Sequence, residues 1–280
     1  MPRPADRPLL IAVMFVHVAL TIVLNLAFRP EWPWLNTLTA NLIFLVTMSA
    51  LLFWRGGVRP ADVGLVWERV PGGVGFTLLV FGVALVGFGV LDAALAGVRV
   101  YGDWGRLEPS RLTLNLVAHL VAVAPYEEIT FRGFLFVQFY LFFRARRPGS
   151  AMLAALLGSQ LFFALSHAPN RIWIGGDVGA ALSFGIVSLL LSGIVYTLVY
   201  LFTGNLFAVI GFHALKNLPP LALESPEGTL WTLTSGVLQT SALLIALIWW
   251  WRSRETSLFR RLRVAGPAQD AEAGTGGRRS

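Results

Sequence analysis

The chain has 280 residues, of which 56% are hydrophobic and 13% are charged, and its mean hydropathy is +0.68. Soluble domains carry roughly 25% charged residues, so this composition predicts a polytopic helical membrane protein and argues against a soluble two-domain protein. The absence of cysteine excludes disulfides, thiolate nucleophiles and Cys-ligated metal sites. The net charge of +7 comes from arginines that lie between apolar runs, so it indicates orientation in a membrane and not binding of nucleic acid.

Long apolar runs separated by polar loops predict an all-α bundle of about eight membrane-spanning helices. The eight predicted spans are residues 8–28, 36–54, 74–97, 112–143, 150–166, 180–202, 206–223 and 230–251. Together they form one membrane-embedded domain over residues 1–263, and the Gly/Ala-rich tail over residues 264–280 should be disordered.

Arginines divide unevenly between the two sides of such a bundle. The N-terminus, the second-to-third loop, the fourth-to-fifth loop and the start of the C-terminal tail hold two, three, three and five arginines. The loops of the opposite side hold one, three and one. The positive-inside rule therefore predicts a multi-pass protein with both termini in the cytoplasm. The arginine-rich composition suits a prokaryotic plasma membrane.

His17 stands alone in the first span, and we interpret it as a packed residue and not as a ligand. Glycines of the third span, among them Gly82 and Gly89, would permit close contact between helices.

The fourth span is too long for one straight crossing. Residues 112–143 would form a helix of about 48 Å, whereas the hydrocarbon core is roughly 30 Å thick. We therefore expect this span to be bent or broken, with Pro125 as the break point. A helix that begins near Pro125 would carry Glu127 and Glu128 in its first turn, where the helix dipole favours negative charge.

Ionised side chains at this depth cost several kcal/mol each unless they are paired or hydrated. Glu128 and Arg132 are four residues apart, so they share a helix face and can pair as a buried structural ion pair. Glu127 then points about 100° away and is free for another role. Two further polar sites follow on separate predicted spans. The three sites are Glu127, Glu128 and Arg132; Phe163 and His167; and His213 and Asn217.

Each site has a structural interpretation when it is taken alone: His167 can cap a helix end, and His213 can hydrogen-bond between helices. Taken together, an unpaired Glu, two His and an Asn in an apolar bundle are the groups that water activation and charge stabilisation require.

The order Glu-Glu-x-x-x-Arg, Phe-x-x-x-His and His-x-x-x-Asn on separate membrane helices resembles the CPBP family of intramembrane glutamic endopeptidases. This family includes CAAX prenyl proteases and bacteriocin-processing or immunity proteins. The resemblance covers about residues 121–221, and it implies a catalytic half at about residues 111–223.

The resemblance implies an endopeptidase that needs neither a metal nor another cofactor. Glu127 would be the general base, His167 would bind and polarise the water, and His213 and Asn217 would stabilise the oxyanion. Glu128 and Arg132 would support Glu127. The partners would be a peptide or protein substrate, which can be membrane-associated, and the lipid bilayer.

Three alternatives stay open. Glu127, His167 and His213 could ligate zinc in a metal-dependent hydrolase, although no His-Glu-x-x-His motif occurs. Buried Glu and His could form the relay of a proton-coupled transporter, although the sequence shows no inverted repeat. The chain could also be a non-proteolytic membrane scaffold or immunity protein.

Overall fold

The structure, a computed structural model, describes residues 4–27, 37–95, 99–100, 109–170, 179, 185–218, 223–225, 228–253 and 257–264. The N-terminal helices are α1 (Arg7–Ala27), α2 (Thr37–Ser49) with its π-helical continuation η1 (Ala50–Arg55), the short 3-10 helices η2 (Pro60–Val63) and η3 (Trp67–Arg69), and α3 (Val70–Ala94). The C-terminal helices are α7 (Ala151–Ser166), α10 (Ile186–Thr203), α11 (Leu206–Lys216), α12 (Trp231–Arg252) and α13 (Leu258–Val264).

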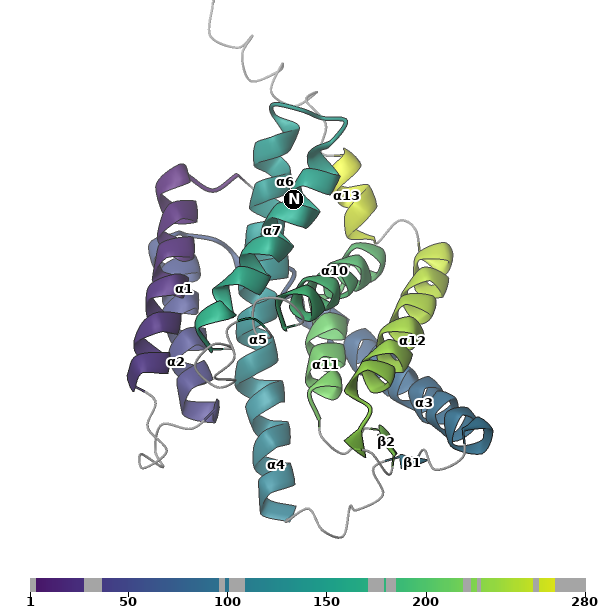
Figure 1. Ribbon diagram of the computed structural model, residues 1–280. Helices are drawn as coiled ribbons and strands as arrows, with labels where there is room; N and C mark the ends of the chain where they lie inside the picture. The colour runs from purple at the N-terminus through teal and green to yellow at the C-terminus, as the bar shows by residue number, and fades with distance from the viewer. Residues whose placement is uncertain are drawn as a thin grey trace, which may run out of the picture.

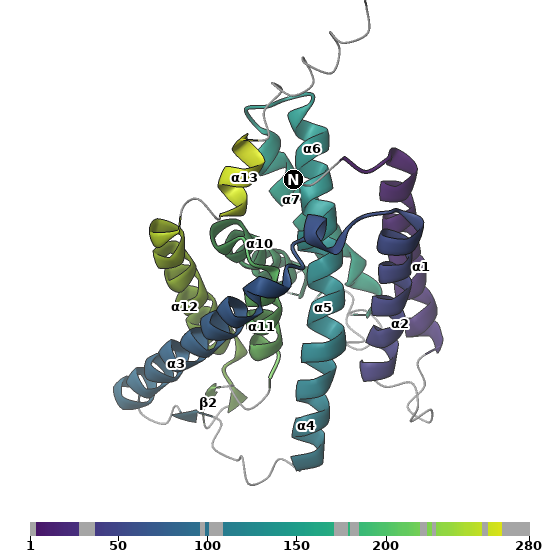
Figure 2. The same ribbon diagram turned by 180° about the vertical axis from the view of Figure 1, so that it is seen from behind.

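Between these two groups stands one long helix. Its consecutive segments are α4 (Pro109–Val117), η5 (Ala118–Val123), α5 (Ala124–Glu127), η6 (Glu128–Leu135) and α6 (Phe136–Arg144). Helices α1 and α2 lie on one side of it, and α3, α11 and α12 lie on the other (Figure 1, Figure 2). The predicted all-α polytopic bundle is confirmed.

A small antiparallel sheet is an addition that the sequence did not predict. Strands β1 (Arg99–Val100), β2 (Leu223–Ser225) and β3 (Gly228–Thr229) pair in the order β1-β2-β3, with Arg99 opposite Glu224. The sheet lies at the end of the bundle where α4 begins, away from the turn between α6 and α7 (Figure 1).

Six stretches of the described residues are helical, long and apolar enough to cross a membrane. They are Arg7–Asn25, Thr37–Arg55, Pro60–Ala94, Ala151–Asn170, Ile186–Thr203 and Thr232–Arg252. The long central helix and α11 occupy the positions of the remaining two predicted spans. The protein is therefore a multi-pass membrane protein.

The central helix passes through Pro125 without a break. We expected a helix that begins near this proline, but the helix begins at Pro109 and continues to Arg144. The reason is a change in hydrogen bonding: η5 and η6 are π-helical, and the N–H of Ala124 donates to the carbonyl of His119, five residues earlier. A widened turn makes room for the ring and the missing donor of a proline, which an α-helical turn does not. Glu127 and Glu128 lie at the junction of α5 and η6.

Helix α11 is shorter than its predicted span over residues 206–223. It has 11 residues, or about 16 Å, and ends at Lys216. Gly204 adopts a φ of +61°, and the side-chain oxygen of Asn205 accepts from the N–H of Phe207, so the short connection between the predicted sixth and seventh spans caps the start of this helix. A helix this short cannot cross the membrane. It is instead buried inside the bundle, where it holds His213 next to the central helix.

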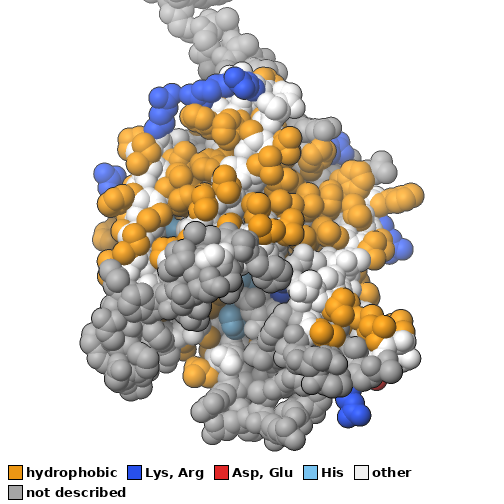
Figure 3. Space-filling view, viewed as in Figure 1, with side chains coloured by type: hydrophobic (Ala, Val, Ile, Leu, Met, Phe, Trp, Pro, Cys, Tyr) orange, Lys and Arg blue, Asp and Glu red, His pale blue; other side chains and the backbone are white. Residues whose placement is uncertain are grey.

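The outer surface of the bundle is apolar. Phe15 is 71% exposed and Leu78 is 63% exposed, and both lie on helices that are long enough to span the bilayer. Figure 3 shows apolar side chains gathered in a band across one face, with Lys and Arg at its margins. This is the pattern of a surface that faces lipid, where exposure of apolar side chains costs nothing.

Candidate active site

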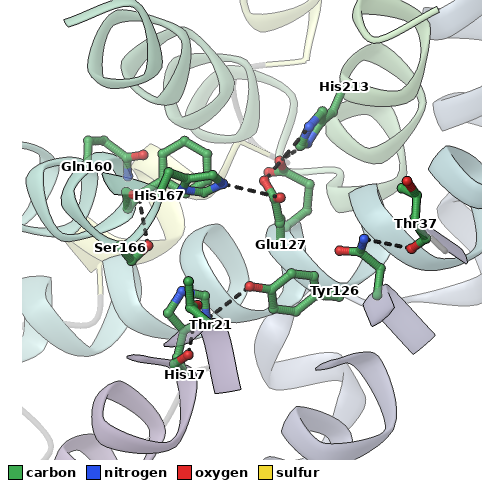
Figure 4. A network of polar contacts seen from close by, with 12 residues as sticks. His17, Thr21, Thr37, Tyr126, Glu127, Gln160, Ser166, His167 and His213 are labelled. Carbon is green, nitrogen blue, oxygen red and sulfur yellow. Dashed lines mark hydrogen bonds and ion pairs between the residues drawn. The ribbon is translucent and has the colours of Figure 1, made fainter. Parts of the chain in front are cut away.

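The central helix, α7 and α11 bring the predicted polar residues together in the middle of the bundle (Figure 4). Glu127 ends α5, Glu128 begins η6, His167 directly follows α7, and His213 lies in the last turn of α11. The two carboxylates, Arg132 and His213 are buried. The predicted sites thus form one cluster, although they are far apart in the sequence.

Glu128 is held by two donors on the same oxygen. Its Oε1 accepts from Arg132 at 3.2 Å and from His213 Nδ1 at 2.7 Å, and all three side chains are nearly or fully buried. The predicted Glu128–Arg132 pair is therefore present, but it also anchors an imidazole from another helix. Because a carboxylate only accepts, His213 Nδ1 carries the hydrogen of this bond, and its Nε2 is turned the other way.

Arg132 makes further contacts that sequence reasoning missed. It donates to Gln160 Oε1 at 3.1 Å, and its guanidinium lies 4.3 Å from the ring centre of Phe163 and 5.0 Å from that of Tyr196. Charge-assisted hydrogen bonds and aromatic faces compensate a buried cation. The sequence could have indicated Gln160, because it lies seven residues before His167 and therefore on the same helix face.

A glycine makes this arrangement possible. A Cβ on Gly193 of α10 would lie 2.5 Å from Gln160 Oε1 and 3.1 Å from the guanidinium of Arg132. A side chain at this position would push the Gln160 amide away from the guanidinium, so glycine keeps α10 close to Arg132.

Glu127 faces the Nε2 atoms of two histidines. Its Oε1 lies 3.6 Å from His167 Nε2, and its Oε2 lies 3.8 Å from His213 Nε2. In each histidine the other ring nitrogen is occupied: His167 Nδ1 donates to the carbonyl oxygen of Phe163 at 2.7 Å, and His213 Nδ1 donates to Glu128. The anchored Nδ1 atoms fix both rings with Nε2 toward Glu127. Phe163, the first residue of the Phe-x-x-x-His motif, therefore orients His167 through its backbone.

A cavity of about 650 Å³ adjoins Glu127. His167, His213 and Asn217 also line it, so a bound molecule could reach all four predicted catalytic residues. Asn217 follows α11 directly, and its backbone N–H donates to the carbonyl of His213. His119 and Tyr196 are further lining residues, and Tyr196 stacks on His213 with ring centres 4.7 Å apart.

His17 has a more specific environment than its interpretation as a packed residue implied. It is buried, its Nδ1 is 3.0 Å from the hydroxyl of Tyr126, and it lies in the wall of the cavity. It therefore connects α1 to the residue that precedes Glu127. No sequence signal identified this contact, because it joins residues 109 positions apart.

The described residues contain no group of three or more His, Asp or Glu side chains with the arrangement of a metal site. The cluster around Glu127 consists of hydrogen-bonding and proton-accepting groups: a carboxylate between two oriented imidazoles, with an amide nearby. Such a set can bind water, accept a proton and stabilise a developing negative charge.

A family model matches the part of the chain that carries this cluster. Residues 109–219 match the model of the family described as type II CAAX prenyl endopeptidase Rce1-like. The matched segment contains every residue of the cluster around Glu127. Neither the comparison with curated proteins nor that with solved structures found a match. Residues 109–219 are therefore similar to CAAX prenyl endopeptidases, as the order of their motifs predicted.

Proposed function

We propose that the chain hydrolyses a peptide bond inside the membrane with a water molecule that Glu127 and His167 activate. The observation that carries this proposal is the position of the Glu127 carboxylate between two imidazoles whose Nδ1 atoms are already bonded elsewhere. The family of the matched segment consists of membrane endopeptidases, which supports the reaction type.

Glu127 and His167 are arranged to share one water molecule. The 3.6 Å between Glu127 Oε1 and His167 Nε2 is too long for a good direct hydrogen bond, which measures about 2.9 Å. A water molecule between them can donate one hydrogen to Glu127 Oε1 and the other to His167 Nε2. A lone pair of the water oxygen then points away from both residues. That oxygen attacks the carbonyl carbon of the scissile bond while Glu127 takes its proton, and the proton then passes to the leaving nitrogen. The products are a carboxylic acid and an amine.

His213 and Asn217 stabilise the oxyanion of the tetrahedral intermediate. Since His213 Nδ1 donates to Glu128, its Nε2 can donate to the oxyanion only when the ring carries both protons. Glu127 and Glu128 balance the positive charge of that imidazolium. Glu128 therefore orients His213, and the two carboxylates together balance the positive charges of Arg132 and of the imidazolium.

The decisive test is Glu127→Gln, which keeps the size of the side chain and removes the base. The substrate is an internally quenched peptide ending in a CAAX sequence, supplied with and without a prenyl thioether, and the protein is purified in detergent. We expect turnover to fall by a factor of about 10³ or more, because a general base contributes roughly 10²–10⁴ in rate. The melting temperature should stay close to that of the wild type.

Wild-type turnover by Glu127→Gln would refute the mechanism. If the wild-type protein cleaves neither peptide while it is folded and inserted, the non-proteolytic alternative gains support. Cleavage of both peptides at equal rates would show that the prenyl group is not required.

Chelation separates this mechanism from a zinc hydrolase. We expect turnover to be unchanged after prolonged dialysis against a strong chelator such as 1,10-phenanthroline, since water activation here uses only a carboxylate and an imidazole. Loss of turnover with recovery on addition of Zn²⁺ would favour the metal-dependent alternative instead.

A further inference from the structure

The first two helices, which lie outside the matched segment, form one wall of the cavity. Four lining residues of α1 and four of α2 follow helical spacing, so each set occupies one face of its helix. The polar members used below are His17, Thr21, Asn25, Thr37 and Asn41. Other faces of the same helices are apolar and exposed, as Phe15 at 71% and Val46 at 65% show. Each helix thus presents apolar side chains outward and a face that includes these polar residues to the cavity.

The two asparagines of this wall have side-chain oxygens that are available as hydrogen-bond acceptors. Asn25 Nδ2 donates to the carbonyl oxygen of Thr21 at 2.7 Å, and Asn41 Nδ2 donates to that of Thr37 at 2.8 Å. The hydroxyl of Thr21 donates to the carbonyl oxygen of His17 at 2.9 Å. The Thr21 hydroxyl and one hydrogen of each asparagine amide are therefore bonded within their own helices. Among the described residues, no donor is bonded to the side-chain oxygen of Asn25 or Asn41.

A row of acceptors on a membrane helix has few natural complements. Lipid tails offer no donor, and an unsatisfied polar group in an apolar medium is costly. An extended peptide, in contrast, carries an N–H at every residue other than proline, and these groups must find acceptors when the peptide leaves water. The chemistry of the wall therefore matches the backbone of a peptide and not a lipid chain.

The helix ends that line the cavity also indicate where the cavity opens. Asn25 lies in the last turns of α1 and Thr37 begins α2. Two other lining residues also lie just past the ends of helices: Asn170 follows α7, and Asn217 follows α11. Figure 1 shows the end of α1, the start of α2 and the end of α11 directed away from the turn between α6 and α7. The polar lining thus extends from Glu127 toward that end of the bundle.

We propose that α1 and α2 form the peptide-binding wall of this protease, in which Asn25 and Asn41 accept hydrogen bonds from the substrate backbone as the peptide enters from the end where α1 finishes and α2 begins. This proposal rests on the proposed function. It adds a substrate-binding role for two helices that the matched segment does not include.

The test compares Asn25→Leu, Asn41→Leu and the double variant, using the same quenched peptide. Leucine is close to asparagine in size and suits a membrane helix, and it removes the side-chain acceptor together with the Nδ2 bond to the helix's own carbonyl. A hydrogen bond contributes about 0.5–1.5 kcal/mol, so KM should rise by about fivefold in each single variant and by about twentyfold in the double variant, with kcat within about twofold of the wild type. Thr47→Val is the matched control, because Thr47 lies on α2 but not in the cavity wall, and it should leave both constants unchanged.

A second measurement covers variants that insert poorly. In the Glu127→Gln background, a CAAX peptide with a benzophenone beside the scissile bond is photocrosslinked, and the attachment sites are mapped by mass spectrometry. Crosslinks to α1 or α2 are expected, and crosslinks confined to α10 and α12 would overturn the proposal. An unchanged KM in the double variant, together with loss of turnover in Glu127→Gln, would refute the peptide-binding wall and leave the proposed function intact. Retained turnover in Glu127→Gln would refute the proposed function instead.

Discussion

At the scale of single residues, Glu128 and Arg132 are the most constrained side chains of the site. Both are fully buried, and each is bonded to a second partner, His213 for Glu128 and Gln160 for Arg132. A buried ion pair contributes little net stability compared with apolar residues of the same shape, but loss of one partner leaves the other charge without compensation. These residues therefore support the fold and the site at the same time.

Removal of either charge should destabilise the protein. We expect Glu128→Gln and Arg132→Ala to lower the free energy of unfolding by about 3–5 kcal/mol and to lower turnover as well. Thermal unfolding in detergent, followed with the quenched-peptide assay at a permissive temperature, measures both effects. Arg59→Ala is the control, because Arg59 pairs with Asp62 at the surface, and its melting temperature should be nearly that of the wild type. A wild-type melting temperature for Arg132→Ala would contradict the structural role.

At the scale of helices, two glycines fix the distance between α3 and α11. A Cβ on Gly211 would collide with the hydroxyl oxygen of Thr77, and one on Gly73 would lie 2.6 Å from Cβ of Phe207. The two helices are thus in close contact through their backbones, a packing mode that small residues permit inside a membrane. Because α11 carries His213, this contact also sets the distance between His213 and Glu127.

A side chain at Gly211 should therefore disturb the site as well as the packing. We expect Gly211→Val to lower the melting temperature and to reduce turnover, since α11 must move away from α3. Gly82→Val is the matched control, because Gly82 lies on α3 and a Cβ added there would have no other atom within 4 Å; it should insert, fold and cleave like the wild type. Equal melting temperatures and turnover for the two variants would show that the close contact does not matter.

The π-helical segments η5 and η6 keep the central helix continuous. They let one continuous helix carry Pro125, Glu127 and Glu128 through the centre of the bundle without an interruption. Every residue from Ile129 to Leu135 is buried, so neighbours surround this part of the helix on all sides. Side chains of several helices can then contact it at once, as His167, Gln160 and His213 do.

At the scale of the whole molecule, the two ends of the bundle differ. Helix α1 begins at the end where α6 and α7 are joined and near α13, whereas the small sheet and the start of α4 lie at the opposite end (Figure 1, Figure 2). The arginine distribution predicts that the first of these ends faces the cytoplasm. The proposed peptide entrance would then face the other compartment.

Labelling of single cysteines tests this orientation directly, because the natural sequence has no cysteine. We expect a membrane-impermeant maleimide to label Arg99→Cys in intact cells and to label Gly149→Cys only after permeabilisation. Arg99 lies in β1 at the sheet end, and Gly149 lies in the turn between α6 and α7. The reverse labelling pattern would place the termini outside and the peptide entrance in the cytoplasm.

Local sequence patterns determined the spans and the catalytic candidates of this protein. Length and hydrophobicity of the apolar runs are properties of consecutive residues, so the predicted helices agree with the observed ones to within a few residues at most boundaries. The spacing of four between Glu128 and Arg132 predicted a pair that the structure contains. The order of the three motifs predicted the family that residues 109–219 match.

Only the tertiary structure decided which faces of separate helices meet. The bond from His213 to Glu128, the contact of Arg132 with Gln160 and the position of His17 beside Tyr126 join residues 85, 28 and 109 positions apart. Periodicity assigns a residue to a face of its own helix but does not say which other helix lies opposite. The short α11 depends on the tertiary structure in the same way, because neighbouring helices supply the burial that lets an 11-residue helix stay inside a membrane protein.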